Sequence, residues 1–185
     1  MARNVEIKAR VSSIEALLPR VGALADHGPE SIAQDDTFFA CSAGRLKLRV
    51  FADGHGELIA YERPDAAGPK TSDYCITPVA DPDALRTTLA CALGVTGRVV
   101  KQRTLFLLGR TRVHLDRVEG LGDWLELEVV LREGEPAEHG VAEAQAVLAS
   151  LQVDATQLVS GAYVDLLGTA SAHRNPGAIT AQSTP

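Results

Sequence analysis

The sequence is poor in the features that mark secreted, redox and membrane proteins. Cysteine occurs three times, as Cys41, Cys75 and Cys91, and no pair has the CxxC spacing of a zinc or dithiol site. A small, odd number of cysteines argues against a disulfide framework and fits a reduced cytoplasmic interior. No apolar run is long enough to span a bilayer, and no apolar signal region precedes the first charged segment. We therefore expect a soluble cytoplasmic protein without a membrane partner.

A basic excess is also missing. The 18 Lys and Arg residues are outnumbered by 24 Asp and Glu residues, which gives a formal net charge of −6 at pH 7. General nucleic-acid binders usually carry the opposite balance. The sequence also contains neither a Walker-type Gly-rich loop nor a kinase motif. Any basic clusters must therefore be local, and their ligand should be a compact anion rather than nucleic acid.

The sequence does contain charge on every second residue in five short segments. These are residues 4–10, 45–49, 101–103, 112–116 and 124–128. Residues i and i+2 of a strand point to the same face, so each segment would be apolar on one side and ionic on the other. The ionic sides are also sorted by sign, with two basic rows and one acidic pair. A surface built in this way suits a polyanion bound together with a divalent metal.

The other patterns predict strands joined by tight turns, with helices between them. Ser12 and Glu15 have the spacing of a capping box at the start of the first helix, and Pro19 predicts a kink or a later start. A second helix is expected over residues 81–94, and a third begins at Pro136. Strands are predicted at residues 5–11, 36–39, 44–51, 57–63, 72–77, 99–108, 111–118 and 124–131.

Hairpin-linked strands with inserted helices indicate an α+β class with a largely antiparallel sheet. With 185 residues and 45% hydrophobic content, a single domain over residues 1–168 is the simplest organisation. Residues 169–185 are small, polar and aperiodic, which predicts a disordered tail. Two arrangements of the charged faces stay open. In the first, the charged faces are the solvated side of a half-buried sheet. In the second, the charged faces meet each other inside a closed barrel with a polar lumen.

The distribution of charge favours the lumen. A solvated face usually mixes the signs, because like charges on neighbouring positions repel. Nine of the 18 basic residues fall within predicted strands, namely Lys8, Arg10, Arg45, Lys47, Arg49, Arg63, Lys101, Arg103 and Arg112. Fewer carboxylates lie on the same strand faces as these basic residues, namely Glu6, Asp116, Glu126 and Glu128, with Glu57 as a further candidate. Carboxylate pairs suit Mg²⁺ or Mn²⁺ and arginine forks clamp phosphate, so these are the parts of a phosphoryl-transfer site.

In this order along the chain, the motifs resemble those of the CYTH superfamily. Residues 5–8 resemble its ExExK signature, and the similarity continues through residues 45–49, 61–64, 101–103, 112–116, 120–122, 126–128 and 161–167. The superfamily unites class IV adenylate cyclases, thiamine triphosphatases and inorganic triphosphatases. The resemblance implies a closed antiparallel eight-stranded β-barrel with flanking helices, the triphosphate tunnel. Asn4 stands where the signature has its first glutamate, so one negative charge is missing from the implied metal site.

The resemblance also implies a role for each matching residue. Mg²⁺ or Mn²⁺ would be held by Glu6, Glu126 and Glu128, with Asp116 close by. The phosphate contacts would be Lys8, Arg45, Lys47, Arg49, Arg63, Lys101, Arg103 and Arg112. Catalytic roles fall to Lys8 and Glu6. His114 lies at a strand position that faces the lumen, where a structural hydrogen bond is at least as well supported as a general-base role. Tyr163 and Asp165 are expected to pack or to cap the last helix.

Three functions of different classes follow from this resemblance. The leading hypothesis is an adenylate cyclase-like phosphorus–oxygen lyase, which converts ATP into cyclic AMP and pyrophosphate. The alternative is a triphosphate phosphohydrolase acting on inorganic tripolyphosphate or thiamine triphosphate, in which Lys8 activates water. The third is a non-catalytic nucleotide- or polyphosphate-binding protein, which Asn4 supports. The expected partner is thus a triphosphate, and the oligomeric state, a homodimer included, stays open.

Overall fold

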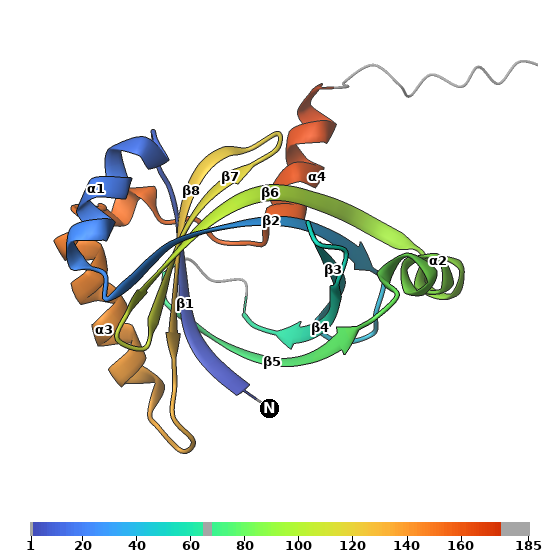
Figure 1. Ribbon diagram of the computed structural model, residues 1–185, viewed down its shortest axis with the longest axis horizontal. Helices are drawn as coiled ribbons and strands as arrows, with labels where there is room; N and C mark the ends of the chain where they lie inside the picture. Colours follow the sequence, from blue (N-terminus) through green and yellow to red (C-terminus); the bar gives the residue numbers. More distant parts are fainter. Residues whose placement is uncertain (1, 65–67, 175–185) are drawn as a thin grey trace, which may run out of the picture.

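Eight antiparallel strands close into a barrel within the described residues, 2–64 and 68–174, of this computed structural model (Figure 1). The strands are β1 (Ala2–Arg10), β2 (His27–Phe39), β3 (Arg45–Phe51), β4 (Gly56–Glu62), β5 (Lys70–Val79), β6 (Val95–Leu108), β7 (Thr111–Val118) and β8 (Gly122–Val130). They pair in the order β1-β5-β4-β3-β2-β6-β7-β8, and β8 pairs with β1. The predicted closed eight-stranded barrel is confirmed.

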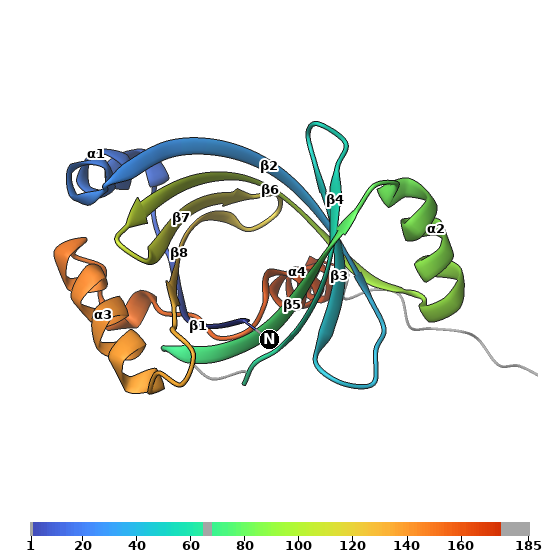
Figure 2. The same ribbon diagram turned by 60° about the horizontal axis from the view of Figure 1, so that its bottom comes forward.

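The helices pack against the outside of this barrel. They are α1 (Ile14–Leu24), α2 (Pro82–Leu93), α3 (Ala137–Ser150), the short 3-10 helix η1 (Ala155–Gln157) and α4 (Tyr163–Arg174). Figure 2 shows α1 and α3 on one side of the barrel and α2 on the other. The contacts of α3 are with β1 and β8, and those of α4 are with β6.

The hydrophobic core lies outside the barrel wall, between the strands and the helices. On β1, Val5, Ile7 and Ala9 are buried in the cluster that packs against α1 and α3. Asn4, Glu6 and Lys8 alternate with them and point inward, where they line a cavity. The same alternation places the apolar positions of β7 and β8 in the outer core. The charged faces therefore meet each other inside the barrel, as the sign pattern predicted.

Several element boundaries differ from those predicted. The N-cap of α1 is Ser13 rather than Ser12, and its hydroxyl accepts a hydrogen bond from the Ala16 amide. The helix runs through Pro19 from Ile14, so the later start is wrong. The strand predicted at residues 36–39 extends back to His27. It does so because β2 pairs with β6 over almost its whole length, and such long-range pairing leaves no alternating pattern in residues 27–34.

The predicted domain boundary at residue 168 lies inside α4, which continues to Arg174. The first part of the predicted tail is therefore helical, and residues 175–185 lie outside the described residues. Leu166 and Leu167 pack against the cluster around Trp124, so the first turns of α4 are anchored on the barrel. The following residues, 168–174, are small or polar and show no apolar periodicity from which a helix could be predicted.

Cys41, Cys75 and Cys91 are free and exposed. Among the helices of the described chain, none combines the length and the apolar character that crossing a membrane requires.

The packing of α3 on β1 predicts a test of the core. A Cβ added at Gly140 of α3 would lie 2.8 Å from both Leu131 Cδ2 and Val5 Cγ2. Overpacking of this kind costs about 1–3 kcal/mol, more than the ~1 kcal/mol that alanine gains over glycine in a helix. We therefore expect Gly140→Ala to lower the free energy of unfolding, measured by urea denaturation.

Gly168→Ala is the matched control, because Gly168 lies in α4 and has no atom within 4 Å of an added Cβ. Here the gain in helix propensity, up to about 1 kcal/mol, should act alone and raise stability. A Gly140→Ala variant as stable as the parent would show that α3 does not pack closely on β1.

Candidate functional site

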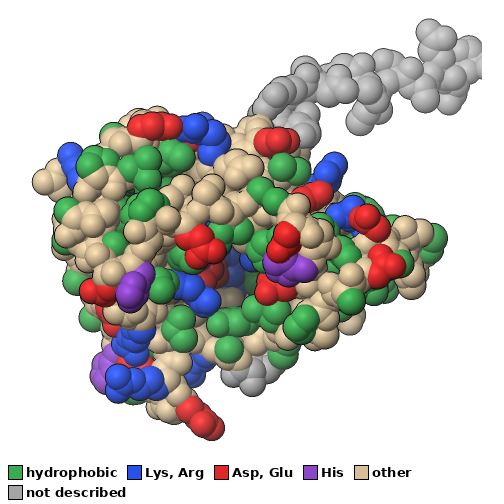
Figure 3. All heavy atoms as spheres, in the orientation of Figure 1, with side chains coloured by type: hydrophobic (Ala, Val, Ile, Leu, Met, Phe, Trp, Pro, Cys, Tyr) green, Lys and Arg blue, Asp and Glu red, His purple; other side chains and the backbone are tan. Residues whose placement is uncertain are grey.

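The barrel encloses a cavity of about 310 Å³ that is lined by ionic side chains. Figure 3 shows the hollow at the centre of the molecule, with Lys, Arg, Asp and Glu side chains inside it. Inward positions of all eight strands contribute to the lining, and so do Ala162 and Tyr163 at the start of α4. This volume is at the lower end of the range for small-molecule sites, about 300–1,000 Å³.

Most of the predicted phosphate-binding residues line the cavity, namely Lys8, Lys47, Arg49, Arg63, Lys101, Arg103 and Arg112. The exception is Arg45, whose guanidinium pairs with Asp165 at 2.8 Å. Asp165 also accepts a hydrogen bond from the Ala162 amide, so it caps α4 as expected. Arg45 therefore connects β3 to α4 and lies outside the cavity lining.

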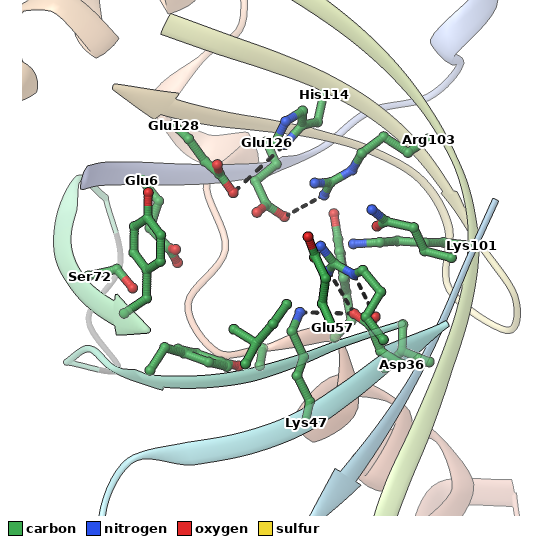
Figure 4. A pocket seen from close by; sticks show the side chains of 18 of the residues that line it. Glu6, Asp36, Lys47, Glu57, Ser72, Lys101, Arg103, His114, Glu126 and Glu128 are labelled. Atoms are coloured by element: carbon green, nitrogen blue, oxygen red, sulfur yellow. Dashed lines mark hydrogen bonds and ion pairs between the residues drawn. The ribbon is translucent and has the colours of Figure 1, made fainter. Parts of the chain in front are cut away.

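A cluster of potential metal ligands lies on the wall formed by β7 and β8. Ligand atoms of His114, Glu126 and Glu128 all lie within 4.8 Å of one another. Figure 4 shows these three side chains converging in the cavity. Glu6 of β1 is the register partner of Glu128, and its carboxylate pairs with Arg63. Three of the predicted metal ligands are thus brought to one region, and His114 joins them.

Among the buried side-chain atoms without a hydrogen-bond partner in the described residues, two at this wall are of types that can bind a metal. They are Asn4 Oδ1 and His114 Nδ1, and the latter lies 3.9 Å from Glu128 Oε1. Burial disfavours the charged imidazole and Arg103 repels it, which together lower the pKa of His114 to about 4. The imidazole is therefore neutral at pH 7, the form that ligates metals. An amide oxygen, a neutral imidazole and two carboxylates make a donor set that fits a divalent cation.

Asp116 lies elsewhere than predicted. Its side chain is fully buried, is absent from the cavity lining, and accepts hydrogen bonds from Arg103 Nε and Nη2, both at 2.7 Å. It also accepts a bond from the Tyr163 hydroxyl at 3.1 Å, and Lys101 Nζ lies 3.5 Å away. Although burial alone would raise the pKa of this carboxyl, Arg103 and Lys101 hold it below its usual range. Its oxygens thus contact cations, and Asp116 is not part of the cluster formed by His114, Glu126 and Glu128.

The sequence analysis missed an ion cluster on the opposite wall. Asp36 of β2 accepts bonds from Lys47 at 2.9 Å and from Arg49 Nε at 2.8 Å, and it is 2% exposed. Lys47 and Asp36 lie across the cavity from Glu128 in Figure 4. The adjacent Asp35 pairs with Arg98 outside the barrel. Because both neighbouring positions carry a carboxylate, the sequence shows no alternation of charged and apolar residues here. Only the register of β2 against the basic strand β3, in which Asp36 faces Arg49, would have revealed its role.

The cavity carries more cations than carboxylates. The seven basic residues named above face five lining carboxylates, Glu6, Asp36, Glu57, Glu126 and Glu128. Because Lys101 is buried and Arg103 repels its ammonium, its pKa falls to about 7. A polyanion that enters the cavity would restore the full charge on this group.

A CYTH domain model matches residues 2–163, almost the whole described chain. This chain belongs to the CYTH family. A search of curated proteins finds no significant match. The family assignment therefore stands on the domain match and on the barrel with its ionic interior.

Solved structures share the fold of this CYTH protein. PH1012 of Pyrococcus horikoshii OT3 is 24% identical, with 89% of this chain and 99% of that chain covered and a TM-score of 0.79. A candidate adenylate cyclase of Vibrio parahaemolyticus is 19% identical, over 89% and 97% of the two chains, with a TM-score of 0.76. A candidate adenylyl cyclase of Hippeastrum with a dominant triphosphatase activity is 16% identical, over 94% and 96%, with a TM-score of 0.60.

The low pKa of Lys101 predicts proton uptake when a polyanion binds. At pH 8.5 the Lys101 amine is mostly neutral in the empty cavity, because its pKa is about 7. Inorganic tripolyphosphate should raise this pKa because its charge favours the ammonium form, and any proton exchanged by the ligand itself would appear equally in a variant that lacks the amine. We expect uptake approaching about one proton per site, measured by titration calorimetry in buffers of different ionisation enthalpy.

Lys101→Met is the control for this measurement. It removes the titrating amine and leaves the six other cations of the cavity in place. Binding should persist with little proton uptake. Uptake of the same size in Lys101→Met would assign the proton to another group.

Proposed function

We propose that this protein is a metal-dependent enzyme that acts on a nucleoside triphosphate inside the barrel, converting ATP into cyclic AMP and pyrophosphate. The observation that carries this proposal is a set of apolar and aromatic side chains, here called the rim, that line the cavity together with the ionic residues. A ligand with an aromatic head and a polyanionic tail matches both parts.

The rim consists of apolar lining side chains from five neighbouring strands, β2 to β6. These residues are Ile32, Phe51, Ile59, Ile76 and Leu105. Ile59 pairs with Ile76, Phe51 pairs with Gln34, and Ile32 pairs with Arg103. On the β3–β4 turn, His55 stacks on Phe51 with ring centroids 4.2 Å apart and planes inclined by 13°. Ile76 is 47% exposed, so the rim leaves apolar surface open for a purine base.

The metal site would be formed by Glu126, Glu128 and His114, with Glu6 and Asn4 on the neighbouring strand. A divalent cation bound there supplies Lewis-acid stabilisation of phosphoryl charge and lowers the pKa of a hydroxyl group beside it. The unpaired Asn4 Oδ1 and His114 Nδ1 support this assignment, because buried polar atoms are normally satisfied. Asn4 replaces a charged ligand with a neutral one.

The chain's own groups would provide the remaining chemistry. In cyclisation, a bond forms between the ribose 3′ oxygen and the α-phosphorus as the bond to the β-phosphate oxygen breaks. The Glu6 carboxylate, which lies opposite Glu128, would accept the 3′-hydroxyl proton. Lys8 would stabilise charge on the α-phosphoryl oxygens, and the cations of the opposite wall would hold the departing pyrophosphate.

The second candidate is a triphosphate phosphohydrolase. The ionic chamber holds cations on both walls, so it suits tripolyphosphate without any use of the rim. The dominant triphosphatase activity of the Hippeastrum relative favours this candidate. In this reaction Lys8 would orient or activate a water molecule at the terminal phosphorus. The third candidate is a binding protein without turnover. The neutral side chain of Asn4 favours this candidate because it supplies no charge to a metal site.

One product assay separates the three candidates. Purified protein is incubated with ATP, tripolyphosphate or thiamine triphosphate in the presence of Mg²⁺ or Mn²⁺, and the products are resolved. Cyclic AMP with an equal amount of pyrophosphate supports the cyclase. Orthophosphate release without cyclic AMP overturns it in favour of the hydrolase. Micromolar triphosphate binding without turnover under any metal leaves only the binding protein.

The acidic pair of β8 predicts a further result. Glu126→Gln and Glu128→Gln keep the shape of the side chain but remove a charge that should hold the metal, so each should lower turnover by two orders of magnitude or more, measured at saturating Mn²⁺. Glu62→Gln, at the exposed end of β4, is the control and should retain activity.

The same two variants should differ in stability. Glu126 lies 3.7 Å from Lys8 and 3.6 Å from Arg103, and these cations hold its pKa well below the usual range although burial alone would raise it. Glu126→Gln should therefore lower the free energy of unfolding by up to about 3 kcal/mol. Glu128 pairs with the more exposed Arg112, so Glu128→Gln should change stability by less than about 1 kcal/mol. Unchanged turnover in both variants would exclude a metal site on β8.

A further inference from the structure

Tyr163, the first residue of α4, reaches into the ionic interior of the barrel. It lines the cavity and is 5% exposed. One side of its environment is apolar, where it packs in a cluster with Phe38, Val99, Val118 and Trp124. The sequence analysis expected this packing role. The contacts on its other side are ionic and come from three strands of the barrel.

Two lysines lie over the Tyr163 ring. Lys8 Nζ of β1 is 3.9 Å from the ring centroid, and Lys101 Nζ of β6 is 5.2 Å from it. Both distances are within the ~6 Å over which an aromatic face attracts an ammonium group. The Tyr163 hydroxyl donates to Asp116, which in turn holds Arg103 through two bonds. A single side chain of α4 thus contacts, directly or through one carboxylate, three of the phosphate-binding cations.

The local charge balance explains why an aromatic residue suits this position. Lys8, Lys101 and Arg103 are each no more than 5% exposed, and these three cations form ion pairs with two carboxylates, Asp116 and Glu126. A third carboxylate would neutralise the excess positive charge that an anionic ligand needs. An aliphatic side chain would leave that charge without stabilisation. The face of an aromatic ring attracts the ammonium groups and keeps their net charge available.

We propose that Tyr163 is a positioning residue for the phosphate-binding cations. Its ring holds Lys8 and Lys101 at the cavity wall, and its hydroxyl fixes Asp116 and through it Arg103. Helix α4 is then part of the binding site and more than a cover for the barrel. This inference rests on the proposed function only in taking a triphosphate as the ligand.

The test compares three variants in tripolyphosphate binding without metal, by calorimetry in the presence of a chelator, and in steady-state kinetics. Tyr163→Leu removes ring and hydroxyl and should weaken tripolyphosphate binding by about tenfold or more, with KM raised by a similar factor. Tyr163→Phe keeps the ring and should restore affinity to within about threefold of the parent. Leu167→Ala removes packing of α4 on the same cluster without touching a cation, so it should lower the melting temperature and leave affinity unchanged.

The outcomes separate this inference from the proposed function. A parent protein that binds no triphosphate overturns both. A parent that binds and turns over substrate, with Tyr163→Leu equal to it, overturns the role of Tyr163 alone. Loss of affinity in Leu167→Ala as large as in Tyr163→Leu would mean that the ring only docks α4. If Tyr163→Leu does not fold, Tyr163→Met fills similar space without a ring and should show the same loss of affinity.

Discussion

The structure depends on keeping ionised side chains inside a barrel, away from bulk water. A buried charge is costly unless it is paired, and a pair is favourable only when its hydrogen bonds are also satisfied. The interior meets this condition with Asp116 and Asp36, each of which accepts the fork of an arginine and lies close to a lysine. These two pairs hold cations in fixed positions on two walls. The space between them stays open and net positive.

This arrangement moves the hydrophobic core to the outside of the barrel. The strands present their apolar faces outward, so the helices have to cover them, and α1 and α3 do so over β1, β7 and β8. Close packing of α3 on β1 is possible because Gly140 lets the helix approach Val5 and Leu131. The alternation along each strand then directs the charged side chains of the strands into the cavity.

The likeness to other CYTH structures concerns the barrel, and the chemistry depends on what each chain places inside it. Here His114 and the β8 glutamates form a cluster of possible metal ligands, Asn4 has an unpaired oxygen within the described chain, and the rim supplies apolar surface from β2 to β6. The cyclase and hydrolase proposals use the same cations and the same proposed metal ligands. They differ in whether a ribose hydroxyl or water is placed at the phosphorus, which depends on how the rim holds the ligand.

The sequence by itself determined the strands with alternating charge and most of the charged residues of the cavity lining, and its resemblance to the CYTH superfamily implied the closed barrel. Period-two patterns are local, and a lumen rich in one sign of charge leaves a clear signature in them. The sequence did not reveal the early start of β2, the extension of α4, the ion cluster at Asp36 or the contacts of Tyr163. It also placed Asp116 with the metal ligands, although the structure pairs it with Arg103. These features were decided by the tertiary structure, because each depends on contacts between segments far apart in the chain. The alternation along one strand shows which face a charged side chain lies on, but not which residue of another segment it contacts.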